Sequence, residues 1–308
     1  MDTPTATDRV VREAGGDEVV DRLVGLSGAD LTTLLLRVMR LRADRLTPAD
    51  VARRYRSDRF VAPASVPFQL LRRTEDRLLS LLPDGFEPVT LAPVVPLGTH
   101  SVLGTVHQNK VLATVRGTEV AADATNGLAL VAADRRAGSL AADARSARPV
   151  RLAAVQRLVR AQQEARAGRF AHFGLVGFVT AGRDTGDLAF ELRHVVAHVR
   201  YLVRAVLELG GGGVELRLAV ARPRLAPVGA AVRDAFAGRC DVTVVDDPDR
   251  VAAGGYYDGL CYKLFAVRGD TRREIGDGGL VDWTRLLLGN NKERLVIGGI
   301  GVEALATL

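Results

Sequence analysis

Residues 154–178 read AVQRLVRAQQEARAGRFAHFGLVGF, which is two short apolar runs joined by a polar, arginine-containing loop. The first run ends at Val159 and is followed directly by Arg160, and the second begins near Phe170 and continues to Phe178. Short apolar runs on either side of a polar loop are typical of paired β-strands. The stretch therefore predicts a hairpin with an arginine at the end of one strand and an aromatic ring at the start of the next.

Such a hairpin has a chemical use in binding a nucleotide. The guanidinium of Arg160 can donate paired hydrogen bonds to a phosphate, and the ring of Phe170 can stack on a base. The loop carries Arg166, which could close over the rest of the nucleotide. The alternative is an arginine-rich surface hairpin with Phe170 in the core, and the hairpin alone leaves both interpretations open.

The remainder of the chain mixes helical and strand-like stretches without a regular order. Helices are expected at residues 68–82, 186–209 and 226–237, and strands at residues 86–95, 110–116, 214–221, 240–247, 262–269, 273–283 and 295–301. A doubly wound parallel sheet would show steady alternation of strands and helices. We therefore predict an α+β fold, a mainly antiparallel sheet flanked by helices.

The N-terminal part reads differently from the rest. Leu and Val recur at helical spacing over about residues 8–58, with Asp30 as a candidate N-cap and Thr47 as another, before a proline at the first helical position. The proline-rich stretch that starts at Pro63 interrupts this pattern. We therefore predict a small helical segment over residues 1–62 and one larger domain over residues 63–308.

The composition of the 308-residue chain, 47% hydrophobic and 25% charged, is that of a globular protein. No apolar run approaches the roughly 20 residues that span a bilayer, and the N-terminus lacks a secretion signal. Two cysteines, Cys240 and Cys261, support neither a disulfide framework nor a cysteine-based zinc site. We therefore expect a cytoplasmic protein that does not bind membranes.

The formal charge of +6 is a weak sign of a nucleic-acid partner. Only three of the basic residues are lysines, and the richness in Arg, Ala, Val and Gly indicates a compositional bias instead. His194 and His198 are four residues apart but lack the glutamate of a zinc-protease motif. Neither a nucleic-acid partner nor a metal site of the protein's own side chains is predicted.

The hairpin resembles motif 2 of the class II aminoacyl-tRNA synthetases, and of histidyl-tRNA synthetase in particular. Arg160 and Gln162 stand where that motif has its arginine and its glutamate. The resemblance implies that Arg160 is catalytic and contacts the α-phosphate of ATP, that Phe170 stacks on adenine, and that Arg166 reaches ATP from the loop. Gln162 replaces a carboxylate by an amide, which loses the charge and keeps an acceptor.

Other segments follow in the order of the same family. Residues 84–95 (DGFEPVTLAPVV) resemble motif 1 with its proline at Pro93, which implies a homodimer formed through this region. Residues 114–130 lie where the synthetases place an acidic amino-acid-binding loop. Glu119 is the residue expected to bind an ammonium group, with Arg116 beside it, and a capping or surface role for Glu119 is the alternative.

The expected amino-acid pocket also includes residues from later in the chain. Tyr256 and Tyr257 match a tyrosine pair of the histidyl enzyme, and His172 joins them in the expected pocket. The arginine that precedes this pair in the family falls on Ala252, so the residue tied most closely to histidine activation is absent. Asp277 and its neighbouring glycines resemble the glycine-rich turn before motif 3, where they are expected to form a tight bend; a purely structural turn is the alternative.

Residues 296–305 (VIGGIGVEAL) resemble motif 3, a strand that leads to Gly-any-Gly-any-Glu-Arg. Gly299, Gly301 and Glu303 are in place, but Ala304 stands at the arginine. The change removes contacts to ATP that are worth roughly 1.5–3 kcal/mol each as charged hydrogen bonds. The sequence stops at Leu308, so no anticodon-binding domain is expected to follow.

Two functions are compatible with this pattern. The first is a free-standing ligase that activates an amino acid or a similar carboxylate with ATP and Mg²⁺ for a purpose other than tRNA charging. The second is a non-catalytic paralogue, similar to the regulatory subunit of ATP phosphoribosyltransferase, that senses a small ligand and binds a protein partner. Arg160 and Phe170 favour the ligase by a small margin, whereas Ala304 and Gln162 count against it.

Overall fold

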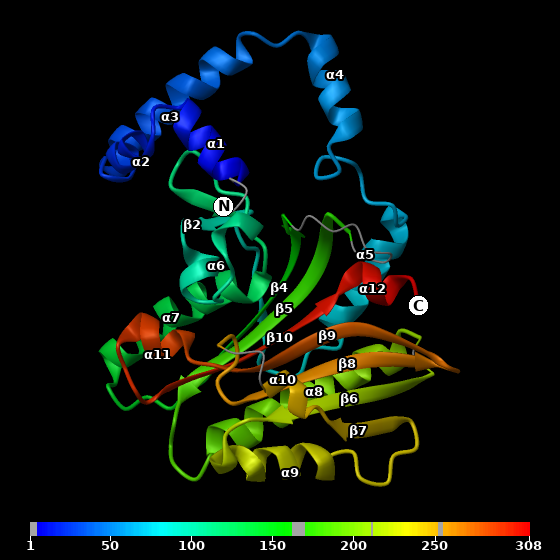
Figure 1. The fold of residues 1–308 in the computed structure, drawn as a ribbon. Helices are drawn as coiled ribbons and strands as arrows, with labels where there is room; N and C mark the ends of the chain where they lie inside the picture. The colour runs from blue at the N-terminus through cyan, green and yellow to red at the C-terminus, as the bar shows by residue number, and fades with distance from the viewer. Residues whose placement is uncertain (1–4, 162–169, 211, 252–254) are drawn as a thin grey trace. The chain divides into compact units, whose positions relative to one another are not determined.

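The fold was analysed in a computed structural model, which describes residues 5–161, 170–210, 212–251 and 255–308. The chain forms two compact units, one made of residues up to Ala62 together with Ala113–Thr118, and the other of Pro63–Leu112 with Glu119–Leu308. Figure 1 shows the elements of both units. No helix in the described residues is both long and apolar enough to cross a membrane.

The first unit contains four helices in its described residues. They are α1 (Ala6–Glu13), α2 (Asp17–Val24), α3 (Gly28–Ala43) and α4 (Pro48–Ser57). Thr47 caps α4, since its side chain accepts a hydrogen bond from Asp50 N and the Asp50 carboxylate accepts one from Thr47 N. For α3 the expected cap is wrong by three residues: Ser27 is the N-cap, and Asp30 N donates to its hydroxyl.

The second unit is built on an eight-stranded sheet with the order β1-β4-β5-β10-β9-β8-β6-β7. Its strands are β1 (Glu87–Pro88), β4 (Val150–Val159), β5 (His172–Arg183), β6 (Gly213–Val220), β7 (Val242–Asp246), β8 (Leu260–Arg268), β9 (Thr271–Val281) and β10 (Glu293–Gly301). Only β1 with β4 and β6 with β7 pair in parallel, and the other neighbours are antiparallel. The predicted mainly antiparallel α+β fold is confirmed.

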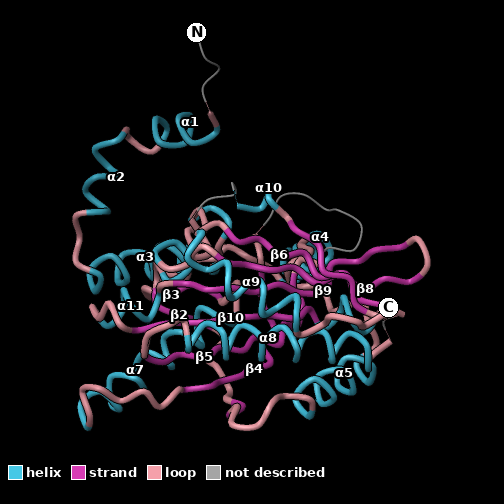
Figure 2. The backbone as a smooth tube through the Cα atoms, turned by 90° about the horizontal axis from the view of Figure 1, so that it is seen from below, coloured by secondary structure: helices cyan, strands magenta, loops and turns pink. Residues whose placement is uncertain are grey.

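Helices cover both faces of this sheet. They are α5 (Phe68–Ser80), α6 (Thr99–Val102), α7 (Ala124–Ala142), α8 (Ala189–Glu208), α9 (Ala226–Asp234), α10 (Pro248–Val251), α11 (Trp283–Leu288) and α12 (Val302–Ala306). One core cluster joins α8 and α9 to Phe178 of β5, and the other joins α7 and α11 to Val179, the next residue along that strand. Successive side chains of a strand point to opposite faces, so the two clusters lie on opposite sides of the sheet. Figure 2 shows α8 running along β10.

The hairpin at residues 154–178 forms as predicted. β4 pairs antiparallel along its full length with residues 172–181 of β5, and Val159 lies opposite His172. The chain end also follows its prediction, because β10 ends at Gly301 and α12 follows it directly. Both features were readable from local sequence, since apolar runs and glycines mark the strands and their ends.

Two further local predictions are wrong, and the strand expected at residues 86–95 forms only as two short pieces, Glu87–Pro88 and Val94–Pro96. Residues 110–116 do not form a strand: a short 3-10 helix, η1 (Gln108–Lys110), is followed by a turn in which Gly117 has a φ of +66° and Thr114 N donates to Thr118 O at 2.8 Å. The strand in this region is the short β3 (Thr118–Val120), and another short strand is β2 (Val94–Pro96). Asp277 and its glycines do not form a tight bend either, because they lie inside β9.

Candidate active site

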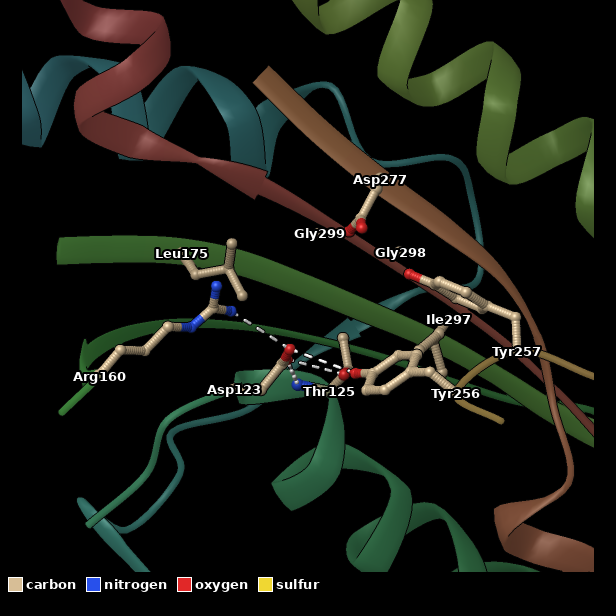
Figure 3. Close-up of a pocket in the computed structure, with 10 residues that line it drawn as sticks. All are labelled: Asp123, Thr125, Arg160, Leu175, Tyr256, Tyr257, Asp277, Ile297, Gly298 and Gly299. Atoms are coloured by element: carbon tan, nitrogen blue, oxygen red, sulfur yellow. Dashed lines mark hydrogen bonds and ion pairs between the residues drawn. The ribbon is translucent and has the colours of Figure 1, made fainter. Parts of the chain in front are cut away.

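A pocket opens on the α7 face of the sheet, where several elements of the second unit meet (Figure 3). It encloses a space of about 270 Å³, part of it open to solvent. The residues that line it come from the start of α7, from β4, β5, β9 and β10, and from the segment before β8; they are Asp123, Thr125, Arg160, Leu175, Tyr256, Tyr257, Asp277, Ile297, Gly298 and Gly299. Arg160, Tyr256, Tyr257, Asp277 and Gly299, all predicted site residues, are thus brought together.

Arg160 enters the pocket from the end of β4 and is held there by three contacts. Its Nε donates to Ala122 O at 2.9 Å, its Nη2 lies 3.5 Å from Oδ2 of Asp123, and its guanidinium lies over the ring of Phe173 at 5.1 Å. The Arg160 side chain remains 41% exposed, so its donors reach the open space. This guanidinium is therefore positioned to bind an anion in the pocket.

Asp123 supplies the carboxylate that faces Arg160. It is the N-cap of α7, and its Oδ1 accepts hydrogen bonds from Thr125 N at 2.9 Å and from Thr125 Oγ1 at 2.8 Å. Its Oδ2 faces Arg160 and also accepts a long hydrogen bond of 3.4 Å from the Tyr256 hydroxyl. The positive end of the helix dipole stabilises this negative charge. Asp123 was missed by the sequence analysis, although its position before Thr125 at a helix start marks it as a cap.

The two tyrosines form one wall of the pocket. Their rings meet edge to face at 4.8 Å, and Tyr256 packs in the same way on Trp283 at 5.5 Å. Burial, and then the nearby carboxylates of Asp123 and Asp277, raise the pKa of both hydroxyls well above 10. Both tyrosines therefore stay neutral and can donate hydrogen bonds at physiological pH.

Asp277 lies on the opposite side of the pocket from Asp123 and is paired with an arginine that the sequence analysis missed. Arg250 of α10 donates from Nη2 to Asp277 Oδ2 at 2.9 Å and lies over the ring of Tyr257 at 5.4 Å. Burial raises the pKa of Asp277 above the usual carboxyl value, and the attraction of Arg250 opposes this rise. The Nη1 of Arg250 is buried and has no hydrogen-bond partner among the described residues.

Arg250 precedes the tyrosine pair by two residues more than the arginine of the resembled motif does. Ala252, at the expected position, lies outside the described residues. The sequence does show an arginine before the tyrosine pair. Because its spacing from the tyrosines differs from that of the resembled motif, Arg250 was not predicted to reach the pocket. An arginine therefore does reach the tyrosine pair, by its contact with Tyr257.

Glycines bring β9 and β10 close together under the pocket. In the register of these strands Gly299 lies opposite Asp277, and Gly298 lies opposite Gly278. A Cβ on Gly276 would lie 2.3 Å from Gly299 O, and one on Gly278 would lie 2.5 Å from Ile297 O. These distances are shorter than any real contact, so the glycines are required for strand packing rather than for a bend.

Glu119 does not line the pocket. Its side chain is fully buried and accepts hydrogen bonds from His100 N at 2.8 Å, Gly98 N at 3.1 Å and Gln108 Nε2 at 2.8 Å. Burial opposes its ionisation, but these hydrogen bonds outweigh burial and lower its pKa. Glu119 therefore holds the loop around His100, and Asp123 provides the accessible carboxylate that was expected from Glu119.

The pocket is not lined by three other predicted site residues, Glu303 and Phe170 from the expected ATP side and His172 from the expected amino-acid pocket. Glu303 is buried at the start of α12, where its carboxylate accepts from Gly174 N at 2.7 Å and from Arg157 Nη2 at 3.0 Å. His172 accepts on Nδ1 from Arg157 Nε at 2.8 Å. Phe170 is half-buried and packs against the core cluster that contains the residues of α12.

The other predicted residues can be placed only in part. Gly301 ends β10, and a Cβ on it would meet the side chain of Ala304 at 3.3 Å. Arg116 is exposed in the turn that belongs to the first unit. Gln162 and Arg166 lie outside the described residues. No cluster of three or more His, Cys, Asp or Glu side chains in the described parts of the chain could hold a metal ion.

Solved structures share this fold. A histidine–tRNA ligase subunit from Alicyclobacillus acidocaldarius is 17% identical with a TM-score of 0.56, over 80% of this chain and 94% of that one. An ATP phosphoribosyltransferase regulatory subunit/histidyl-tRNA synthetase from Bacillus halodurans is 14% identical with a TM-score of 0.58, over 80% of this chain and 81% of that one. Histidyl-tRNA synthetase from a Nostoc species is 14% identical with a TM-score of 0.55, over 80% and 73% of the chains.

No family model matches the chain, and no curated protein matches its sequence. Identities below one fifth show a common fold and nothing about the reaction. The second unit therefore has the fold of the class II aminoacyl-tRNA synthetase domain, and the resemblance drawn from the ordered motifs is confirmed at that level.

Proposed function

We propose that the pocket binds a small molecule that carries an amino group and a carboxylate, and that the chain activates this carboxylate with ATP. One observation carries the proposal: Arg160 and Asp123 lie 3.5 Å apart in one pocket, with both side chains partly exposed. A guanidinium and a carboxylate at this spacing match the two charged ends of an amino acid. The neutral hydroxyl of Tyr256 adds a donor and acceptor beside Asp123.

The chemistry follows from these groups. The ligand's ammonium would bind Asp123, which releases Arg160 to bind the carboxylate or a phosphate. The carboxylate oxygen would attack the α-phosphorus of ATP, forming an acyl–phosphate bond while the bond to pyrophosphate breaks. Arg160 would stabilise the negative charge that develops on the α-phosphate oxygens. Mg²⁺, bound with ATP, would neutralise the departing pyrophosphate.

The chain offers Arg160 for the α-phosphate of ATP, but it lacks the arginine that the resembled motif provides for the rest of the nucleotide. Ala304 replaces the arginine expected at the start of α12. Arg294 on β10 cannot take its place, because its Nη2 is paired with Asp184 at 2.7 Å and its Nε with Glu191 at 3.0 Å. The charge of the outer phosphates would therefore depend on Mg²⁺ and on residues outside the described ones.

The absence of an arginine at Ala304 supports a second candidate function, a ligand sensor that binds the same small molecule without adenylation. The Arg160–Asp123 pair and the tyrosine wall serve binding alone equally well. One of the structures with this fold is described as an ATP phosphoribosyltransferase regulatory subunit/histidyl-tRNA synthetase, which is compatible with a sensor. A homodimer formed through residues 84–95, and a protein partner, remain predictions for either function.

The two candidates are separated by amino-acid-dependent exchange of labelled pyrophosphate into ATP, combined with thermal shift of the full chain. Exchange that D123N and R160K both reduce by at least tenfold supports the ligase. The matched control is R204K, because Arg204 is exposed on α8 and, among the residues that the structure describes, its ion pair is with Glu208.

Stabilisation by an amino acid, with no exchange and no shift from Mg-ATP, supports the sensor and contradicts the ligase. If no amino acid shifts the melting temperature and none supports exchange, both candidates are wrong.

A further inference from the structure

The pocket presents three accessible charged side chains, two carboxylates and one guanidinium (Figure 3). Asp123 is 22% exposed, Arg160 is 41% exposed and Asp277 is 43% exposed. Arg250 is only 13% exposed, because it is turned towards Asp277 and the ring of Tyr257. A bound ligand therefore meets a negative, a positive and a negative group.

We infer that the ligand of this pocket is a basic amino acid, whose side-chain cation binds Asp277 while its ammonium binds Asp123 and its carboxylate binds Arg160. The inference rests on the proposed function, because it assigns the substrate class of the same pocket. The proposed function needs Asp123 and Arg160 to bind any amino acid. The present inference adds Asp277 as the residue that selects the side chain.

Asp277 has one oxygen available for this contact. Its Oδ2 accepts from Arg250, whereas its Oδ1 receives no hydrogen bond from the described residues. Loss of hydration raises the pKa of Asp277, Arg250 opposes this rise, and the repulsion of Asp123 adds to it. The side chain is still 43% exposed, so a cation can approach Oδ1, and its charge would favour the ionised form of Asp277.

The space beside Asp277 suits a side chain that ends in a cation. Gly299 lies directly opposite Asp277 on the neighbouring strand, and residues that face each other in antiparallel strands point to the same side of the sheet. Gly299 therefore places no side chain next to the carboxylate, and the nearest atom to a Cβ there would be Cδ1 of Leu175 at 3.3 Å, at the end of a flexible side chain. The rings of Tyr256 and Tyr257 line the pocket, where they can pack on an alkyl chain and attract its cationic end.

The charge of Asp277 also selects against other kinds of side chain. An acidic side chain would meet Asp277 as a like charge, and an apolar one would remove water from Asp277 without replacing it. Arg250 already neutralises part of this charge, which limits the preference for a cation to about tenfold or somewhat more.

The test measures binding of matched amino acids to the full chain by calorimetry at pH 7.5. L-Lysine is compared with L-norleucine, and L-arginine with L-citrulline, because each pair has a similar shape and differs in the side-chain charge. We expect the charged member of a pair to bind at least tenfold more tightly. In D277N this preference should fall to about twofold, while binding of L-norleucine changes little.

D241N is the matched control, since Asp241 loses the same charge and is paired with Arg239 at 2.6 Å, and neither of these residues lines the pocket. It should keep the preference of the unchanged chain. Tighter binding of L-norleucine than of L-lysine, or a preference that D277N leaves intact, would overturn the inference and leave the proposed function standing. Failure of every amino acid to bind would overturn both, and the wild-type comparison remains decisive even if D277N does not fold.

Discussion

Gly298 and Gly299 are neighbours on β10, yet a side chain on each would meet opposite layers of the molecule. A Cβ on Gly298 would lie 2.4 Å from Cζ of the buried Phe178, on the side of α8. A Cβ on Gly299 would lie 3.3 Å from Cδ1 of Leu175, which lines the pocket. The alternation of a strand thus assigns one glycine to the core and the other to the pocket.

Replacing each glycine by alanine should therefore have a different effect, mainly on stability for G298A and mainly on ligand binding for G299A. G298A overpacks the core and is expected to lower the free energy of unfolding by about 2–3 kcal/mol. G299A should cost less than about 1 kcal/mol, because the end of the Leu175 side chain can move, but it should weaken ligand binding. Urea unfolding and calorimetry measure the two effects, and equal losses of stability in both variants would contradict this assignment.

The pair of Arg136 and Glu293 joins α7 to the start of β10 with both side chains fully buried. Two hydrogen bonds of 2.8 Å connect them, from Arg136 Nε and Nη2 to the two oxygens of the carboxylate. E293A leaves an uncompensated buried charge and should lower the free energy of unfolding by about 3–5 kcal/mol.

The control for that measurement is E13A, since Glu13 pairs with Arg9 at an exposed site on α1. Exposed pairs contribute between 0 and about 1 kcal/mol, so E13A should change the unfolding midpoint in urea only slightly. If E293A lowers the free energy of unfolding as little as E13A does, then water can compensate the charge of Arg136 and the buried pair is not required for stability.

Glu303 ties the last helix to the hairpin. It accepts hydrogen bonds from the buried Gly174 N and from Arg157, whose side chain is partly exposed. E303A leaves Gly174 N without a partner and should cost about 2–3 kcal/mol of stability, whereas E303Q keeps an acceptor and should cost about 1 kcal/mol. If chemical denaturation ranks the two variants in the reverse order, the charge of Glu303 rather than its hydrogen bond to Gly174 is the stabilising feature.

His194 predicts how stability depends on pH. Burial, and then the charges of Arg151 and Arg193, lower its pKa to about 4, against an ordinary value of 6.5. Between these values the unfolded chain takes up a proton that the folded chain does not, so the contribution of His194 is complete above pH 6.5 and is lost as the pH falls towards 4. The loss should amount to about 3 kcal/mol.

H194Q isolates this effect, because it removes the titration and leaves the rest of the chain unchanged. His198 is buried nearby, and burial and then the charge of His194 lower its pKa, so the larger part of its contribution, from burial, is common to both proteins. The difference in unfolding free energy between H194Q and the unchanged chain should vary from pH 7 to pH 4.5. A constant difference over that range would show that His194 titrates normally in the folded protein.

The sequence allowed a close prediction of the hairpin and of the sheet class. The apolar runs around Arg160 gave β4 and β5, and the absence of strand–helix alternation indicated an antiparallel sheet. It did not distinguish Glu119 from Asp123 as the pocket carboxylate, because both lie in one short stretch and only the start of α7 decides which is exposed. Arg250 was missed because the loop before the tyrosines differs in length from the resembled motif.

What the sequence by itself determined are features with local causes: the caps of α4, the strands on either side of residues 162–169, and the strand that ends at Gly301. Each depends on residues a few positions apart, so periodicity and turn chemistry are sufficient. Only the tertiary structure decided that Asp277 faces Gly299 across a strand pair and shares a pocket with Arg160. That arrangement is set by the register and order of strands far apart in the chain, which depend on packing of the whole sheet and leave no local pattern.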